Sequence, residues 1–143
     1  MAESTFLAGK VTKQSLPALP VPVGAEAPRL KRLLLPQGEL AQFHDGGEPI
    51  HYLAFLELGA DSIRGNHYHK VKAEYLYLIH GEVLLLVEDI AVKSRESLPL
   101  RTGDLVHIQT GVAHALKILA PGQAIEFSKA PFNPADIYRW PLT

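Results

Sequence analysis

The 143-residue chain contains no cysteine, so it can form neither a disulfide bond nor a thiolate metal site. Any metal would have to be held by nitrogen and oxygen ligands. No apolar run approaches the roughly 18 residues of a membrane-spanning helix. An excess of one charge is also missing, because 14 Lys and Arg face 15 Asp and Glu for a formal net charge of -1. These absences argue against partners such as nucleic acid and membranes, and they leave small molecules and other proteins.

The first ten residues lack the apolar core of a signal peptide. With the absence of cysteine, this leads us to expect a soluble, cytoplasmic protein. The length fits one domain with a sizeable core of its own.

Long segments with helical periodicity are absent as well. Short apolar runs alternate instead with turns that contain some of the 11 glycines, for example at residues 80–81 and 121–122, and this pattern predicts an all-β fold. The expected strands are residues 30–35, 39–43, 51–58, 67–70, 74–79, 82–87, 98–100, 104–108, 113–119 and 123–129. The polar segment 88–99 is expected to be exposed, as a hairpin arm or a solvated loop.

Four prolines within residues 11–28 favour extended backbone and exclude helix. We therefore divide the chain into an N-terminal arm, residues 1–28, and a β-barrel domain, residues 29–143. The apolar arm lies across its own barrel or a partner subunit, or it is a free tail. Continuous apolar runs at residues 33–35 and 84–87 indicate strands buried on both faces or covered by a second subunit, and we expect a homodimer.

Four residues have the character of metal ligands. His67 and His69 are two apart, so a strand would present both imidazoles on one face, either as ligands or as half-exposed polar residues. Glu74 follows after residues 70–73, which can turn the chain back so that a carboxylate faces the histidines. His114 begins a later strand after a Gly-containing turn, and it reaches the others only if the sheet closes on itself.

Two segments resemble the motifs of the cupin family. Residues 65–81, GNHYHKVKAEYLYLIHG, are similar to the first motif, and residues 103–118, GDLVHIQTGVAHALKI, are similar to the second. The resemblance implies a jelly-roll barrel with one divalent metal on His67, His69, Glu74 and His114. Gln109 and Ile118 replace the usual Pro and Asn, a Gly of the first motif is shifted, and none of these changes touches a ligand.

Three imidazoles and a carboxylate accept Zn, Fe, Mn, Ni, Co or Cu, so the sequence does not identify the metal. The segment 64–70, RGNHYHK, and the C-terminal residues 132–138 also resemble cupin domains that work beside sugar-nucleotide enzymes of capsule and deoxysugar biosynthesis. This narrower resemblance implies metal-assisted proton transfer beside a sugar carbonyl, as in an epimerase or isomerase. An iron-dependent dioxygenase and a non-catalytic ligand-binding cupin are the alternatives.

Acid or base partners are expected among polar residues on strands that line or flank the barrel, and each could instead be a packed aromatic. The candidates are His51, Tyr52, Tyr75, Tyr77 and His107. Arg64 could bind a carboxylate or phosphate, or be a surface charge. Lys70 and Lys72 are expected to face solvent.

Overall fold

A computed structural model describes residues 3–143 as strands with two one-turn 3-10 helices. The all-β prediction is confirmed, and no helix in this part of the chain is long and apolar enough to cross a membrane. The strands are β1 (Glu3–Phe6), β2 (Val11–Ser15), β3 (Ala18–Pro20), β4 (Lys31–Leu35), β5 (Gly38–Gln42), β6 (Tyr52–Leu58), β7 (Ile63–Tyr68), β8 (Glu74–Asp89), β9 (Ser94–Arg101), β10 (Asp104–Ile108), β11 (Val112–Ser128) and β12 (Tyr138–Arg139). The 3-10 helices are η1 (Leu7–Gly9) and η2 (Pro134–Asp136).

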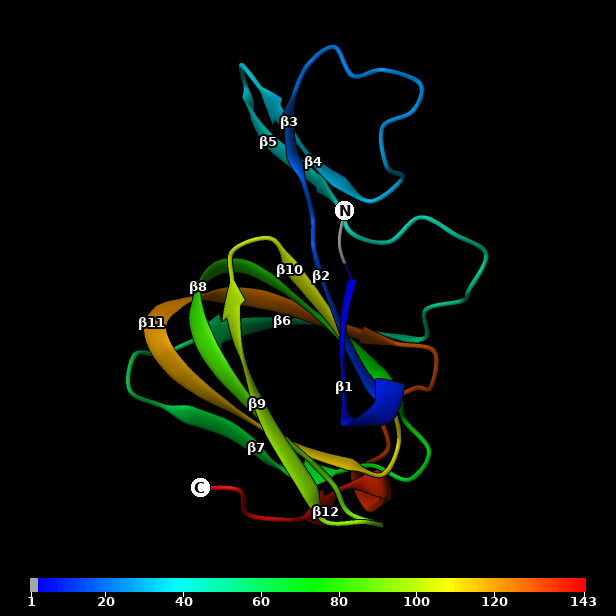
Figure 1. The fold of residues 1–143 in the computed structure, drawn as a ribbon, viewed down its shortest axis with the longest axis vertical. Coiled ribbons are helices and arrows are strands. Elements are labelled where there is room, and N and C mark those ends of the chain that lie inside the picture. The colour runs from blue at the N-terminus through cyan, green and yellow to red at the C-terminus, as the bar shows by residue number, and fades with distance from the viewer. Residues whose placement is uncertain (1–2) are drawn as a thin grey trace.

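A nine-stranded sheet curls into the barrel seen in Figure 1, and it is organised around the two longest strands. The first part of β8 pairs with β10 and its second part with β9. In the same way, β11 pairs with β7 near its start and with β6 near its end. Each long strand therefore pairs with different neighbours in its two halves, and β8 and β11 pair with each other along their length.

The turns predicted at residues 80–81 and 121–122 are wrong, because β8 and β11 run through both positions. Glycine is needed there for close approach of the two strands. A Cβ on Gly122 would lie 1.6 Å from the carbonyl oxygen of His80, and Gly81 has a φ of 122°. The ladder between β8 and β11 shifts register in this region, so the glycines mark a bend with bulges instead of a chain reversal.

The barrel interior is filled by residues of one strand face. On β8, Leu76 and Leu78 belong to the main core cluster, whereas Tyr77 packs in a second cluster with Leu16, Leu105 and Phe127. Successive side chains of a strand point to opposite faces, so Glu74 shares the interior face with Leu76. This alternation decides which polar residues reach the inside of the barrel.

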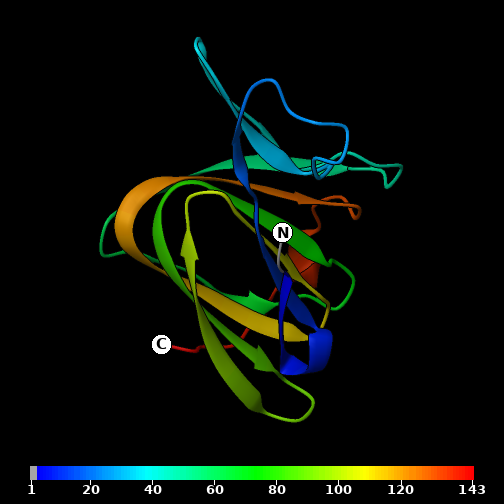
Figure 2. The ribbon, with the colours of Figure 1, turned by 45° about the horizontal axis from the view of Figure 1, so that its top comes forward.

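A second, three-stranded sheet is formed by β3, β4 and β5 and stands beyond the barrel in both views (Figures 1 and 2). β3 pairs with β4 in parallel, and β4 pairs with β5 as a hairpin. Farther toward the N-terminus, β2 pairs with β10 in the barrel sheet. The two sheets do not follow the division at residue 28, and that domain boundary stays a prediction.

The polar segment 88–99 is part of a hairpin, which was one of the two alternatives. β9 pairs with the second part of β8 from Glu82↔Arg101 to Asp89↔Ser94. The tip and most of the first half of β9 are exposed, while Leu98 and Leu100 enter the core.

Candidate functional site

Three histidines from two neighbouring strands meet inside the barrel. His67 lies on β7, His69 follows that strand, and His114 lies on β11 directly opposite His67 in the ladder. One nitrogen from each ring lies within 4.8 Å of the others, and the ring centroids are 4.9 to 5.5 Å apart. The predicted convergence of these three imidazoles is confirmed.

Glu74 lies beside the histidines and pairs with one of them. Its Oε1 is 2.7 Å from Nε2 of His114, and its Oε2 is 4.0 Å from Nε2 of His69. Burial would raise the pKa of Glu74, but His114 and Lys72 hold it well below its usual range. Burial would lower the pKa of His114, but the carboxylate raises it. We therefore describe Glu74 and His114 as a buried carboxylate–imidazolium pair.

His69 and His67 differ from His114 because they are held neutral. Burial lowers the pKa of His69, and Nδ1 of this ring donates to the carbonyl oxygen of Asp136 at 2.7 Å. Its Nε2 is buried without a hydrogen-bond partner among the described residues. Burial, followed by repulsion from His114 and His69, lowers the pKa of His67 to about 4. Both rings therefore have an unprotonated nitrogen near neutral pH.

Lys72 also lies inside the site, so the prediction that it faces solvent is wrong. It is 7% exposed, and its Nζ is 3.3 Å from Glu74 and 3.2 Å from Glu126. The ammonium also lies 4.4 Å from the centre of the Tyr52 ring. Sequence reasoning missed Lys72 and Glu126, although Lys72 is two residues before Glu74 and would share its face if the strand alternation continued backwards.

A cavity of about 210 Å³ opens beside these groups. Tyr52, Arg64, His67, His69, Lys72 and Glu126 supply its polar wall, and the segment 131–137 covers another side. A smaller space of about 80 Å³ shares Arg64, His67 and Glu126 and extends toward Glu74 and His114. His67 therefore stands between the cavity and the buried ion pair.

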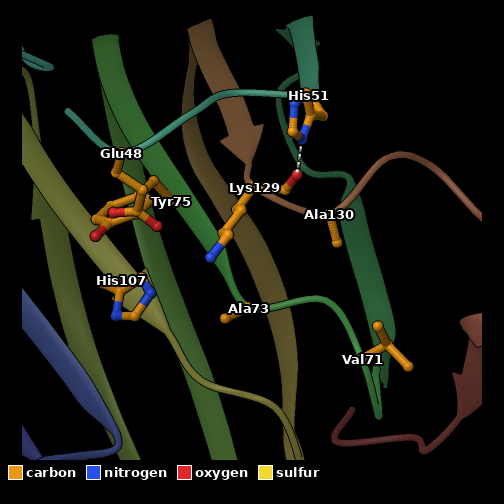
Figure 3. Close-up of a pocket in the computed structure, with 8 residues that line it drawn as sticks. All are labelled: Glu48, His51, Val71, Ala73, Tyr75, His107, Lys129 and Ala130. Carbon is orange, nitrogen blue, oxygen red and sulfur yellow. Dashed lines mark hydrogen bonds between the residues drawn. The ribbon is translucent and has the colours of Figure 1, made fainter.

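Among the acid–base candidates from the sequence, only Tyr52 lines this cavity. His51 and His107 line a different cavity of about 360 Å³, together with Tyr75 and Lys129 (Figure 3). Tyr77 is buried in the second core cluster and stacks on Phe43 at 4.2 Å between ring centroids. Residues of the main core cluster occupy the even-numbered positions of β8 and β10 near these candidates, such as Leu76 and Val106. The opposite strand face carries Tyr75, Tyr77 and His107, and the alternation of side chains along a strand predicts this from the sequence.

The three imidazoles fit a divalent metal, whereas the carboxylate does so less readily. Zinc–imidazole bonds of about 2.0–2.1 Å require the nitrogens to lie at most about 4.2 Å apart, so rings whose nitrogens lie within 4.8 Å of one another would move slightly closer to bind one ion. The free Nε2 of His69 is a suitable donor. Glu74, however, is already paired with His114 and Lys72, and the Lys72 ammonium places a positive charge where a second cation would be repelled. Metal binding stays a prediction.

The barrel built on β8 and β11, with three histidines in its interior, is a cupin jelly-roll fold. No protein-family model matches the chain, and no curated protein matches it in sequence. Solved structures do match. The rmlC epimerase of Mycobacterium tuberculosis has 14% identity and a TM-score of 0.74, and the alignment covers 97% of this chain and 72% of the other.

Two further solved structures show the range of similar proteins. A 3'-monoepimerase from Streptomyces bikiniensis, in complex with dTDP-quinovose, has 15% identity over 94% of this chain and 71% of its own, with a TM-score of 0.74. A 3,4-ketoisomerase from Helicobacter canadensis has 14% identity over 78% of this chain and 86% of its own, with a TM-score of 0.68. At these identities, the likeness establishes the cupin fold predicted from the two motifs.

Proposed function

We propose that the chain is an enzyme that binds a small sugar-like substrate with a carbonyl group and shifts a proton next to that carbonyl. The observation that carries the proposal is the meeting of neutral His67 with the cations Lys72 and Arg64 in one cavity. The similar structures support it, since they are named as sugar epimerases and ketoisomerases.

The size of the cavity favours one small ring. Its volume of about 210 Å³ is below the roughly 300–1,000 Å³ of sites for drug-sized ligands. Hydrogen-bonding groups form about half of its wall, and Leu56, Pro131, Phe132 and Ile137 supply apolar contact. Such a wall suits a hydroxyl-rich ring with one apolar face.

The proposed chemistry uses residues already placed. His67 takes the proton from the carbon beside the carbonyl, and the C–H electrons form the enolate double bond as charge moves to the carbonyl oxygen. Lys72 or Arg64 stabilises that oxygen. For an epimerisation, the Tyr52 hydroxyl then returns a proton to the other face of the same carbon, so the carbonyl re-forms with the stereocentre inverted. For the carbonyl to move, the proton is added to the former carbonyl carbon, the former carbonyl oxygen is protonated, and the neighbouring hydroxyl loses its proton as its oxygen becomes the new carbonyl. In both cases, exchange with water removes the proton held by His67 and restores the one lost by Tyr52.

A metal-loaded site is the second candidate, and it is favoured by the three converging nitrogens and the unpartnered Nε2 of His69. A bound ion would polarise a substrate oxygen, and iron would allow the dioxygenase alternative. Elemental analysis of protein purified without added metal tests this candidate. We expect metal that is lost in a His67→Ala, His114→Ala double variant, and equal metal in both proteins would rule the candidate out. Oxygen uptake would separate the dioxygenase from the isomerase.

The homodimer expected from the sequence also stays a proposal, supported by exposed apolar residues on the outer face of β6. Leu53 is 66% exposed and Phe55 is 56% exposed. Light scattering would distinguish the 15.7 kDa monomer from a species of twice that mass. The cytoplasmic location predicted from the sequence is likewise not tested by the structure.

The decisive test for the enzyme is proton exchange. A dTDP-linked 4-keto-6-deoxy sugar would be incubated with the protein in D2O, because one similar structure is named as a 4-keto-6-deoxy sugar epimerase and another is an epimerase in complex with dTDP-4-keto-L-rhamnose. We expect deuterium to appear in NMR spectra at a carbon beside the carbonyl, and we expect this exchange to be much slower in His67→Asn. Thermal stabilisation by the sugar without any exchange would instead identify a non-catalytic binding protein.

A further inference from the structure

The C-terminal segment touches the site without taking part in the chemistry proposed above. Asp136, the last residue of η2, is 6% exposed and lies against the turn that joins β7 to β8. We infer that Asp136 is a positioning residue that fixes the tautomer and the orientation of His69. This inference rests on the proposed function only for its effect on turnover.

The Asp136 carboxylate binds three successive backbone amides. Oδ1 accepts from the N–H of Lys70 at 2.8 Å and of Val71 at 3.2 Å. Oδ2 accepts from Val71 at 3.1 Å and from Lys72 at 3.0 Å. Consecutive amides that converge in this way form an anion-binding nest. One side chain therefore holds the whole connection between His69 and Glu74.

The backbone of the same residue holds the ring. Nδ1 of His69 is 2.7 Å from the Asp136 carbonyl oxygen, and a carbonyl can only accept. Nδ1 must therefore carry the proton, and in the neutral ring the lone pair is on Nε2, which has no hydrogen-bond partner within residues 3–143. Asp136 thus binds the chain just after His69 and sets which nitrogen of His69 is free.

The segment is attached by contacts that do not use the Asp136 side chain. Asn133 accepts from the Ala135 amide at 3.0 Å, and β12 pairs with β7 through Tyr138 and Arg139. Trp140 donates from Nε1 to Glu88 at 3.1 Å. A substitution at Asp136 keeps the backbone carbonyl but removes the carboxylate from the turn. It should therefore let the turn that follows His69 move, which loosens the His69 ring from that carbonyl while the C-terminal segment stays attached.

The test is the imidazole 15N NMR spectrum of His69 in chelator-treated protein. We expect the wild type to show a protonated Nδ1 and an unprotonated Nε2. Asp136→Ala should give a mixture of both tautomers and lose slow exchange of the amides of residues 70–72. Asp136→Asn, which keeps one acceptor oxygen, should be intermediate. The control is Asp45→Asn, the same chemical change at an exposed residue, and it should match the wild type.

An unchanged His69 spectrum in folded Asp136→Ala would overturn the inference, and an unchanged spectrum in Asp136→Asn would overturn it equally if the alanine variant does not fold. Turnover separates this result from the proposed function. If the wild type does not exchange the sugar proton, the proposed enzyme activity is refuted. An altered His69 tautomer in the Asp136 variants would still support the positioning role. In an active enzyme, we expect Asp136→Asn to lower kcat with little change in KM.

Discussion

Two cavities of this protein contain the same kinds of side chain in different surroundings. The inner cavity has His67, Tyr52, Lys72 and Glu126, and the outer cavity in Figure 3 has His107, Tyr75, Lys129 and Glu48. The outer cavity is the larger, at about 360 Å³ against 210 Å³. Residue types therefore do not distinguish the cavities, and volume alone would favour the outer one.

The cavities differ in how their charged groups are held. Inside the barrel, Lys72 joins Glu74 to Glu126, and Glu74 in turn holds His114. On the outer face, Lys129 and Glu48 are exposed. Fixed charges shielded from water act more strongly on a reacting group than mobile charges at a surface. This contrast leads us to assign the chemistry to the inner cavity.

The strongest test of this contrast between the cavities substitutes one histidine in each of them. His67→Asn should reduce the rate of sugar proton exchange by about 10²- to 10⁴-fold, because a positioned base is lost. His107→Asn should leave the rate unchanged. Deuterium incorporation in D2O measures both, and circular dichroism checks that each variant is folded. A larger loss in His107→Asn would place the chemistry in the outer cavity.

The lysines give the next largest expected effect. Lys72→Met removes the ammonium between two carboxylates, and leaving a buried charge uncompensated costs about 3 kcal/mol or more of the free energy of unfolding. Lys129→Met changes an exposed residue and should stay within about 0.5 kcal/mol of the wild type. Urea unfolding measures the difference. Equal losses would show that the Lys72 pairs contribute no more than surface charges do.

Much of this arrangement could be predicted from the sequence, because strand spacing and the two cupin-like motifs already indicate three histidines that meet in a closed sheet. The neighbouring charges were harder to place. Residues 70–73 were interpreted as a free turn, so Lys72 was assigned to solvent, whereas Asp136 from the far end of the chain fixes that turn. A contact between residues so distant in sequence leaves no local pattern.

The position of Tyr77 outside the inner cavity is a different case, because the sequence already contained the pattern that predicts it. Tyr77 lies three residues after Glu74 on one strand, so the two side chains point to opposite faces. The turn predicted at Gly81 is a separate error, because β8 runs through this position. Whether a glycine reverses the chain or allows a bend depends on the strand opposite, here the backbone around Gly122.

The smallest expected effect is a difference in pH dependence between the two cavities. The pKa of His67 falls from 6.5 to about 4 on folding, so between these pH values the unfolded chain binds a proton that the folded chain does not. The contribution of His67 therefore makes stability decrease as the pH falls from 6.5 to 4. His114, whose pKa is raised, contributes stability that is lost only as the pH rises above 6.5, outside this window.

His67→Asn in chelator-treated protein should flatten this decrease. His107→Asn should flatten it less, because burial lowers the pKa of His107 but the Glu48 carboxylate opposes the shift, whereas two imidazoles reinforce it at His67. Urea unfolding at pH 4 and pH 6.5 gives the change in unfolding free energy for the wild type and both variants. Equal flattening would mean that the two histidines experience similar surroundings, and the electrostatic contrast between the cavities would then rest on the lysines alone.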